Sequence, residues 1–315
     1  MNINKLVTLY VTYCRALGER CRTKEFILRA FCRAVGPRMC ITRIRLKEVC
    51  VFLAGKGPLT NGWHGRYSAL KAFFQFAICR GELARAPLPT TIPKRVPTMA
   101  PYIYSRDEIS RLLEAIPAAR HGNNLMEPHT LRAILLVLYG AGLRRGEALR
   151  LTIADVDLSN SILTIRNTKF FKSRLVPISR DLTKALNDYA HWRATAHPSS
   201  DISGTFFVNR CGKAIYRTTI TTGFNRLRRH AGVRRSDGAR CQPRMHDLRH
   251  SFAVHRLTEW YRQGGDVQRL IYHLSVYLGH AHLADTQVYL TLTPELLQQA
   301  GQRFERYARK EVGHA

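Results

Sequence analysis

The chain has 315 residues, enough for two domains of ordinary size, and its 45% hydrophobic content excludes a largely disordered protein. Its net charge of +28 destabilises a compact fold by self-repulsion unless a polyanion relieves the repulsion. Nucleic acid is therefore the expected partner, and a merely solvated basic surface is the alternative interpretation.

Membrane insertion is not expected. The longest apolar run covers residues 133–143, which is too short to cross a bilayer. The first twenty residues lack a basic leader followed by a small-residue cleavage site. We therefore expect a protein that makes no contact with a membrane and works in the cytoplasm.

The N-terminal part of the chain reads as helical. Residues 4–81 hold four stretches of helical periodicity, and the last stretch ends at Gly81, a residue suited to the left-handed position after a helix. Residues 1–100 carry 18 Lys and Arg against 4 Asp and Glu, so basic charge is densest here. We predict a compact helical domain over residues 1–85, with nucleic acid as its expected partner.

A linker is predicted at residues 86–101. This segment contains five prolines and only two charged residues, which favours an extended, semi-rigid connection. Directly after it, Ser105 and Glu108 have the spacing of a capping box, which indicates the start of a helix. We predict that a second domain covers residues 102–315 and ends with a C-terminal helix.

The second domain reads as helical with a small sheet. The stretch 130–151 predicts two helices broken around Gly140 and Gly142. Two short β-branched runs, 161–167 and 173–179, predict a β-hairpin. Further helices are expected at 180–192, 216–231, 246–261, 266–278 and 294–309. The predicted fold class is mainly α with a small β-sheet.

The eight cysteines are scattered through the chain. No C-x-x-C pair is present, so the spacing indicates neither a zinc site nor a redox dithiol. We interpret the cysteines as reduced, mostly buried apolar residues. No metal ligand set, phosphate-binding glycine loop or other cofactor motif is found, and none is predicted.

Basic residues grouped in short motifs indicate a site that binds an anionic group. His246 and Arg249 are three residues apart, so on a helix they share one face and can converge on an anionic group. Arg144 follows a glycine-broken helix end, and Glu147 is placed one turn later, where it can hold the guanidinium. Each motif alone is weak evidence, because polar helix faces are common.

The remaining candidates follow in chain order. The predicted hairpin turn contains Lys169 and Lys172, and the C-terminal region contains His280 and, nine residues later, Tyr289. A tyrosine in an apolar helix is usually a packing residue. The order Arg, Lys, His-x-x-Arg, His, Tyr favours a different interpretation.

The sequence resembles the tyrosine recombinase family of phage integrases from about residue 4 to residue 305. The motifs that carry the resemblance are GLRRGEAL, TKFFKSRLVPI, HDLRHSFA and LGHAHLADTQVYL, in the order typical of the family. The resemblance implies a helical core-binding (SAM-like) domain followed by an α+β catalytic domain. It places the catalytic positions on Arg144, Lys169, His246, Arg249, His280 and Tyr289. Lys172 remains an alternative to Lys169, because the glycines that often flank the family's lysine are missing here.

These residue types suit attack of a tyrosine on a phosphodiester. The tyrosine hydroxyl has an ordinary pKa of about 10, so a general base or nearby positive charges must favour the phenolate at neutral pH. Arg144 and Arg249 can bind the non-bridging phosphate oxygens and stabilise the added negative charge. His246 can orient or deprotonate the phenol, His280 can donate to a phosphate oxygen, and Lys169 can protonate the leaving 5′ oxygen.

Other residues receive simpler interpretations. Glu147 is expected to hold Arg144. Arg150, Arg174 and His250 are interpreted as phosphate contacts or solvated faces, and no role is assigned to His255 or His282.

The predicted function is site-specific recombination of DNA, as an integrase of a mobile element that forms a 3′-phosphotyrosine intermediate. The resemblance implies double-stranded DNA as substrate and four copies of the chain, or copies with sibling recombinases, on two DNA sites. A topoisomerase of type IB and an inactive DNA-binding regulator are the alternatives. No cofactor is required for this chemistry.

Overall fold

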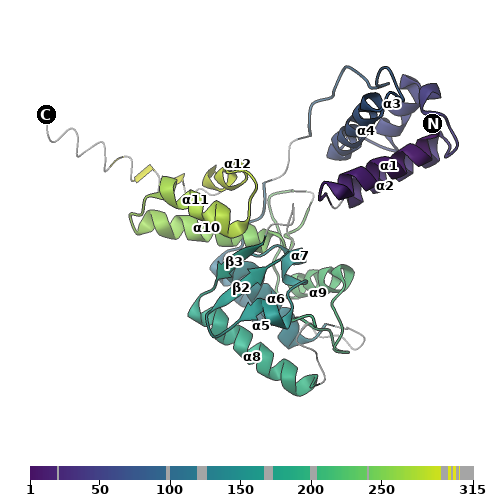
Figure 1. The fold of residues 1–315 in the computed structure, drawn as a ribbon. Coiled ribbons are helices and arrows are strands. Elements are labelled where there is room, and N and C mark those ends of the chain that lie inside the picture. The colour runs from purple at the N-terminus through teal and green to yellow at the C-terminus, as the bar shows by residue number, and fades with distance from the viewer. Residues whose placement is uncertain are drawn as a thin grey trace. The chain divides into compact units, whose positions relative to one another are not determined.

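The computed structural model describes residues 1–315 except 20, 97–99, 119–125, 167–172, 199–203, 240, 292–296, 299–300, 303–304 and 306–315. The chain divides into two compact units, one over Met1–Thr98 and one over Met99–Thr168 with Lys172–Ala315 (Figure 1). Across the described ranges, no helix is long and apolar enough to cross a membrane.

The N-terminal unit is built mainly from helices in its described residues. Its elements are α1 (Ile3–Ala16), α2 (Arg22–Val35), the 3₁₀ helix η1 (Ile41–Arg43), α3 (Leu46–Ala54) and α4 (Asn61–Cys79). The four predicted helices are thus present. Apolar residues recur on one face of each helix and meet in one core, in which Leu6, Phe31, Leu53, Phe73 and Phe74 are fully buried.

The start of the linker segment lies along α4. Leu83, Ala86 and Leu88 pack against the core of this unit. Further along, the side-chain amide of Asn61 donates to the carbonyl of Val96 at 3.1 Å. Because Asn61 is the first residue of α4 and Cys79 is the last, the segment runs back along the helix from its C-terminal to its N-terminal end.

The C-terminal unit begins with the predicted capped helix. In α5 (Arg106–Glu114) the hydroxyl of Ser105 accepts from the Glu108 N–H, and the Glu108 carboxylate accepts from the Ser105 N–H. The other helices in this half of the unit are α6 (Pro128–Gly140), α7 (Arg145–Ala148) and α8 (Arg180–Ala196). The break predicted around Gly140 and Gly142 lies between α6 and α7.

A three-stranded antiparallel sheet in the order β1-β2-β3 follows α7. Its strands are β1 (Val156–Asp157), β2 (Ile162–Ile165) and β3 (Arg174–Pro177). The predicted hairpin corresponds to β2 and β3, whose register pairs Leu163 with Val176. Both of these side chains are fully buried, so one face of the hairpin covers the core of the unit. The two-residue strand β1 was too short to be predicted.

The remaining described elements are α9 (Arg217–His230), α10 (Asp247–Arg262), α11 (Val267–Leu278), α12 (Ala284–Gln287) and the 3₁₀ helix η4 (Val288–Thr291). Each predicted helix up to residue 278 is found within a few residues of its expected bounds. The helix predicted at 294–309 lies largely outside the described residues. The prediction of a mainly α fold with a small sheet is confirmed.

The prediction that most cysteines are buried was wrong. Three are buried, Cys40 is partly buried, and four are exposed. The exposed residues Cys50 and Cys79 lie on the outward faces of α3 and α4, where the arginine-rich sequence gave no periodicity that distinguished them from the buried cysteines.

Candidate active site

A buried carboxylate organises the arginines of the C-terminal unit. Glu147 accepts from the backbone N–H and Nη1 of Arg144 at 2.9 and 2.8 Å, and from Nη1 and Nη2 of Arg174 at 3.1 and 2.9 Å. Burial alone raises the pKa of this carboxyl, but the bonds from Arg174 and Arg144 outweigh burial and lower it to about 2. Glu147 is therefore ionised at neutral pH and holds both guanidinium groups in place.

Arg249 is the most deeply buried cation of the site. Its side chain donates from Nη1 to the carbonyl of Gly142 at 2.6 Å and from Nη2 to the carbonyl of Leu278 at 2.7 Å. Burial, and then the nearby Arg144, lower its pKa to about 10, so the guanidinium keeps its charge at neutral pH. Arg144 donates to the carbonyl of Gly279 at 2.9 Å. Backbone carbonyls at the ends of α6 and α11 thus position both arginines.

Tyr289 lies in η4, with only 3% of its surface exposed. Its hydroxyl is 3.0 Å from Nδ1 of His250. Burial raises the pKa of the phenol, and the charges of Arg249 and Arg144, together with a hydrogen bond from Arg249, oppose this rise without cancelling it. The phenol is therefore protonated at neutral pH, but it lies beside the two cations that would stabilise its anion.

Two histidines flank the phenol. His250 approaches the Tyr289 ring with centroids 5.6 Å apart, and His280 stacks on it at 6.2 Å. Nδ1 of His280 is 2.6 Å from the hydroxyl of Thr286, a fully buried residue of α12. Burial lowers the pKa of both imidazoles to about 4, with further lowering of the His250 pKa by His246 and of the His280 pKa by Arg249. Both are neutral at pH 7.

His246 is an exposed residue directly before α10. Its ring packs edge to face on that of His250, with centroids 4.7 Å apart. The surrounding protein and the charge of Arg249 lower its pKa as well. His246 therefore reaches Tyr289 through His250 and makes its own contact with solvent.

The structure brings together five of the six residues expected from the sequence. Arg144 and Arg249 contact Glu147, and His246, His250 and His280 form a second set of contacts around Tyr289. The charges of the two arginines act on the Tyr289 hydroxyl and so join the two sets. Lys169 and its alternative Lys172 lie outside the described residues.

Two residues of the site, His250 and Arg174, make contacts that were not predicted from the sequence. His250 was assigned to a phosphate contact or solvated face, yet it is the imidazole that contacts the Tyr289 hydroxyl. Its spacing of four residues from His246 on one helix was the available signal. Arg174 was given the same assignment, but it is a bidentate partner of Glu147 with 12% of its side chain exposed. Nothing in the sequence around β3 indicated that pairing.

No metal ligand set is found around Tyr289 among the residues described. In those residues, the one group of three or more His, Cys, Asp or Glu side chains whose ligand atoms converge consists of Cys14, Glu19 and Cys21. These belong to the N-terminal unit.

Comparison with known proteins identifies relatives of this chain. The Phage integrase family matches residues 104–295. A protein of Sinorhizobium fredii that carries the name integrase/recombinase y4rB is 37% identical over 246 residues, which are 78% of each chain. Tyrosine recombinase XerA of Thermococcus kodakarensis is 33% identical over 248 residues, which are 77% of each chain.

A solved structure shares the fold. Lambda integrase, crystallised as a tetramer bound to a Holliday junction, superposes with a TM-score of 0.62 at 15% identity, covering 92% of this chain and 77% of that chain. The family match covers more than half of the chain, and it spans every site residue described above. The chain belongs to the phage integrase family.

Proposed function

We propose that this protein cuts and rejoins DNA strands as a site-specific recombinase, with Tyr289 as the nucleophile. The observation that carries the proposal is the surroundings of the Tyr289 hydroxyl, which contacts His250 and lies beside the charges of Arg249 and Arg144. A tyrosine that only packs needs no cations beside its hydroxyl, whereas here the hydroxyl lies beside the fully buried Arg249 and the partly buried Arg144, and burying charge is costly.

The residues fit the steps of a transesterification. The Tyr289 oxygen bonds to phosphorus, its proton passes to His250, and the bond from phosphorus to the 5′ oxygen breaks. Arg249 and Arg144 stabilise the extra negative charge on the non-bridging oxygens, where fixed cations have their largest effect. Lys169 supplies the proton to the departing 5′ oxygen. His280, neutral at pH 7, can donate a hydrogen bond to a phosphate oxygen.

The product of this step is a 3′-phosphotyrosine ester and a free 5′ hydroxyl. The ester keeps the free energy of the phosphodiester, so a 5′ hydroxyl from a second strand can reverse the reaction. This exchange requires no nucleotide hydrolysis. It accounts for joining as well as cutting.

Tyr289 has to become accessible before it reacts. Reacting atoms must approach to about 3–3.5 Å, and a phenol that is 3% exposed cannot meet a phosphodiester at that distance. The short 3₁₀ helix η4 carries the tyrosine and packs its ring against α10 and α11, between His250 and His280. DNA binding is expected to displace this segment.

The N-terminal unit is proposed as the core-binding DNA domain, followed by a linker over residues 86–101 and a catalytic domain over residues 102–315. Residues 1–100 carry a net charge of +14, which suits contacts with DNA phosphates. Double-stranded DNA is proposed as the substrate, and a tetramer on two DNA sites as the active assembly. The tetrameric lambda integrase structure supports this assembly by shared fold.

Residues 294–315 either pack on their own catalytic domain or dock on a neighbouring protomer, and we propose that they link the protomers of that tetramer. Leu296, Leu297, Ala300, Phe304 and Ala308 recur at steps of three and four residues, so they form an apolar stripe if the segment is helical. Deleting residues 294–315 should leave binding to a single site nearly intact and abolish higher-order complexes on native gels. A truncated protein that still forms tetrameric complexes would exclude this role.

Recombination is separated from the alternative functions by incubating the protein with two duplexes of different length that carry different end labels. A recombinase gives joined products that contain both labels. A topoisomerase relaxes supercoiled plasmid without joining two duplexes, and a regulator binds DNA without cutting it. Either of those two outcomes, obtained with the protein's own target DNA, would refute the proposed function.

A further inference from the structure

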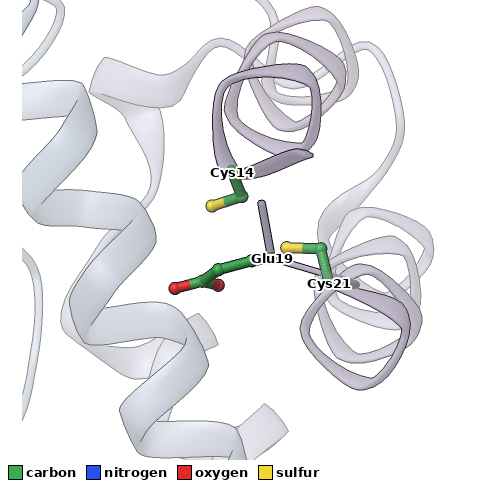
Figure 2. Close-up of side chains that lie close together, drawn as sticks. All are labelled: Cys14, Glu19 and Cys21. Carbon is green, nitrogen blue, oxygen red and sulfur yellow. The ribbon is translucent and has the colours of Figure 1, made fainter. Parts of the chain in front are cut away.

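The junction between α1 and α2 gathers three metal-ligating side chains. Figure 2 shows Cys14 on α1, Cys21 at the start of α2, and Glu19 from the turn that joins the two helices. The two sulfur atoms and a carboxylate oxygen all lie within 4.8 Å of one another. This cluster belongs entirely to the N-terminal unit.

The backbone of the junction fixes this convergence. Cys14 occupies the last turn of α1, and Gly18 reverses the chain in the left-handed region at φ +81°. The N–H of Glu19 then donates to the carbonyl of Cys14 at 2.9 Å, which brings Glu19 back over the helix end. Cys21 adopts φ +47°, a strained conformation for a residue with a Cβ, directly before α2.

The surroundings suit a bound cation better than ordinary packing. Both cysteines are buried, Cys14 with 4% and Cys21 with 8% of the surface exposed. Lys24 donates to Oε2 of Glu19 at 2.6 Å, an outer contact that orients the carboxylate and leaves its other oxygen to act as a ligand.

We propose that Cys14, Glu19 and Cys21 bind one Zn²⁺ ion. Two thiolates and a carboxylate are ligands that zinc uses in proteins, at about 2.3 Å for sulfur and 2.0–2.2 Å for oxygen. In a tetrahedral zinc site such ligand atoms lie roughly 3.5–3.8 Å from one another. The three ligand atoms here lie within 4.8 Å of one another, so each pair has to approach by at most about 1 Å. The fourth position is taken by water. The ion joins the end of α1 to the start of α2 and stabilises the helical unit.

Binding should release protons. Zinc binds cysteine as the thiolate, so each cysteine gives up its proton when the metal binds. A disulfide between the two cysteines is a competing explanation of their proximity, and the test below distinguishes it.

The test uses the full-length protein, reduced and freed of metal, titrated with Co²⁺ as a spectroscopic substitute for Zn²⁺. One equivalent should produce the absorption of tetrahedral cobalt with a thiolate-to-cobalt charge-transfer band, and one equivalent of Zn²⁺ should remove it. Zinc should also raise the thermal midpoint of the protein, because a ligand that binds only the folded state stabilises it.

Variants locate the site. Cys14→Ser and Cys21→Ser should abolish the charge-transfer band, and Glu19→Gln should weaken zinc affinity by roughly 10–100-fold, on the scale of changes at metal sites. Glu19 is only partly buried, so its variant should fold even if a cysteine variant does not. Cys50→Ser and Cys79→Ser, which change exposed cysteines of the same unit, are matched controls that should bind as the wild type does.

Three results would overturn the proposal. They are the absence of a charge-transfer band in the reduced wild-type protein, a band that survives both Cys14→Ser and Cys21→Ser, and a protein mass lower by two hydrogens that shows a disulfide formed in place of metal binding.

Discussion

At the scale of single residues, the site is defined by which charges are paired and which groups are kept neutral. Glu147 is the one carboxylate that contacts the arginines of the site in the part of the chain described, and three of them, Arg144, Arg174 and Arg249, lie within 4 Å of it. Since removing one partner of a buried pair leaves an uncompensated charge, these contacts are mutually dependent.

The sequence identified most of this site and the contact between Glu147 and Arg144, but not the other contacts within it. Residue types and order were sufficient to place Arg144, Arg249, His280 and Tyr289, because each stands in a recognisable motif. The contact between His250 and the Tyr289 hydroxyl depends on how η4 packs on α10, two elements separated by more than twenty residues. Short-range periodicity carries no information about such packing.

The lowered pKa values of His250 and His280 predict a dependence of stability on pH. The unfolded chain binds a proton at each histidine below about pH 6.5, whereas the folded chain binds it only near pH 4. Stability should therefore fall as the pH falls through this window, by about 1–2 kcal/mol for each histidine at pH 5.

Urea denaturation at pH 7, 6 and 5 measures this effect. His250→Gln and His280→Gln should each lose less stability than the wild type between pH 7 and pH 5. His230→Gln, at an exposed position on α9, is the control and should follow the wild type. Identical pH dependence in all four proteins would contradict the assignment.

At the scale of elements, helix ends hold the arginines. Gly142 lies between α6 and α7 at φ +59°, and its carbonyl accepts from Arg249 at 2.6 Å. Gly279 ends α11 at φ +67°, and its carbonyl accepts from Arg144 at 2.9 Å. The sequence predicted the break at Gly142 from its glycines. It could not show that the freed carbonyl would bind a catalytic candidate 107 residues away.

Gly142→Ala should therefore impair both stability and cleavage. A Cβ at this position would lie 2.5 Å from Cδ1 of Phe252 and 2.9 Å from Cδ2 of Leu278, in addition to the strain of a positive φ. We expect a loss of about 3 kcal/mol in the free energy of unfolding. Displacement of Arg249 should reduce the cleavage rate by about 100-fold.

The matched control is Gly238→Ala. Gly238 has a similar φ of +68°, but a Cβ there would meet nothing within 4 Å. It should cost only about 1–2 kcal/mol, the strain of the left-handed region, and leave cleavage unchanged. Equal effects of the two substitutions would show that the crowding around Gly142 has no role in positioning Arg249.

At the scale of the whole molecule, the net charge and the family membership both indicate DNA as the partner. The net charge of +28 indicated a polyanion before any motif was considered, and the four motifs then narrowed the reaction to strand exchange. Composition could indicate neither the buried state of Tyr289 nor the convergence of Cys14, Glu19 and Cys21, because both depend on tertiary packing.

Binding to DNA should weaken steeply with salt. Each neutralised phosphate contributes roughly −0.9 to the slope of log affinity against log salt concentration. With on the order of ten phosphate contacts, affinity should fall by several decades between about 50 and 200 mM salt. A gel-shift or fluorescence anisotropy titration measures the slope, and a nearly flat dependence would mean that the basic charge serves another partner.

The central claim, that the Tyr289 hydroxyl attacks the phosphodiester, is tested most directly by trapping the covalent intermediate. A duplex nicked just downstream of the cleavage site releases the short fragment that carries the new 5′ hydroxyl, which prevents rejoining. A denaturing gel then shows protein attached to the 3′ end of the retained strand, which is labelled at its 5′ end. The wild type and Tyr277→Phe, which changes a neighbouring tyrosine that bonds the carbonyl of Pro177, should both give this adduct. Tyr289→Phe should bind the same DNA and give none. A covalent band that persists in Tyr289→Phe would contradict the assignment.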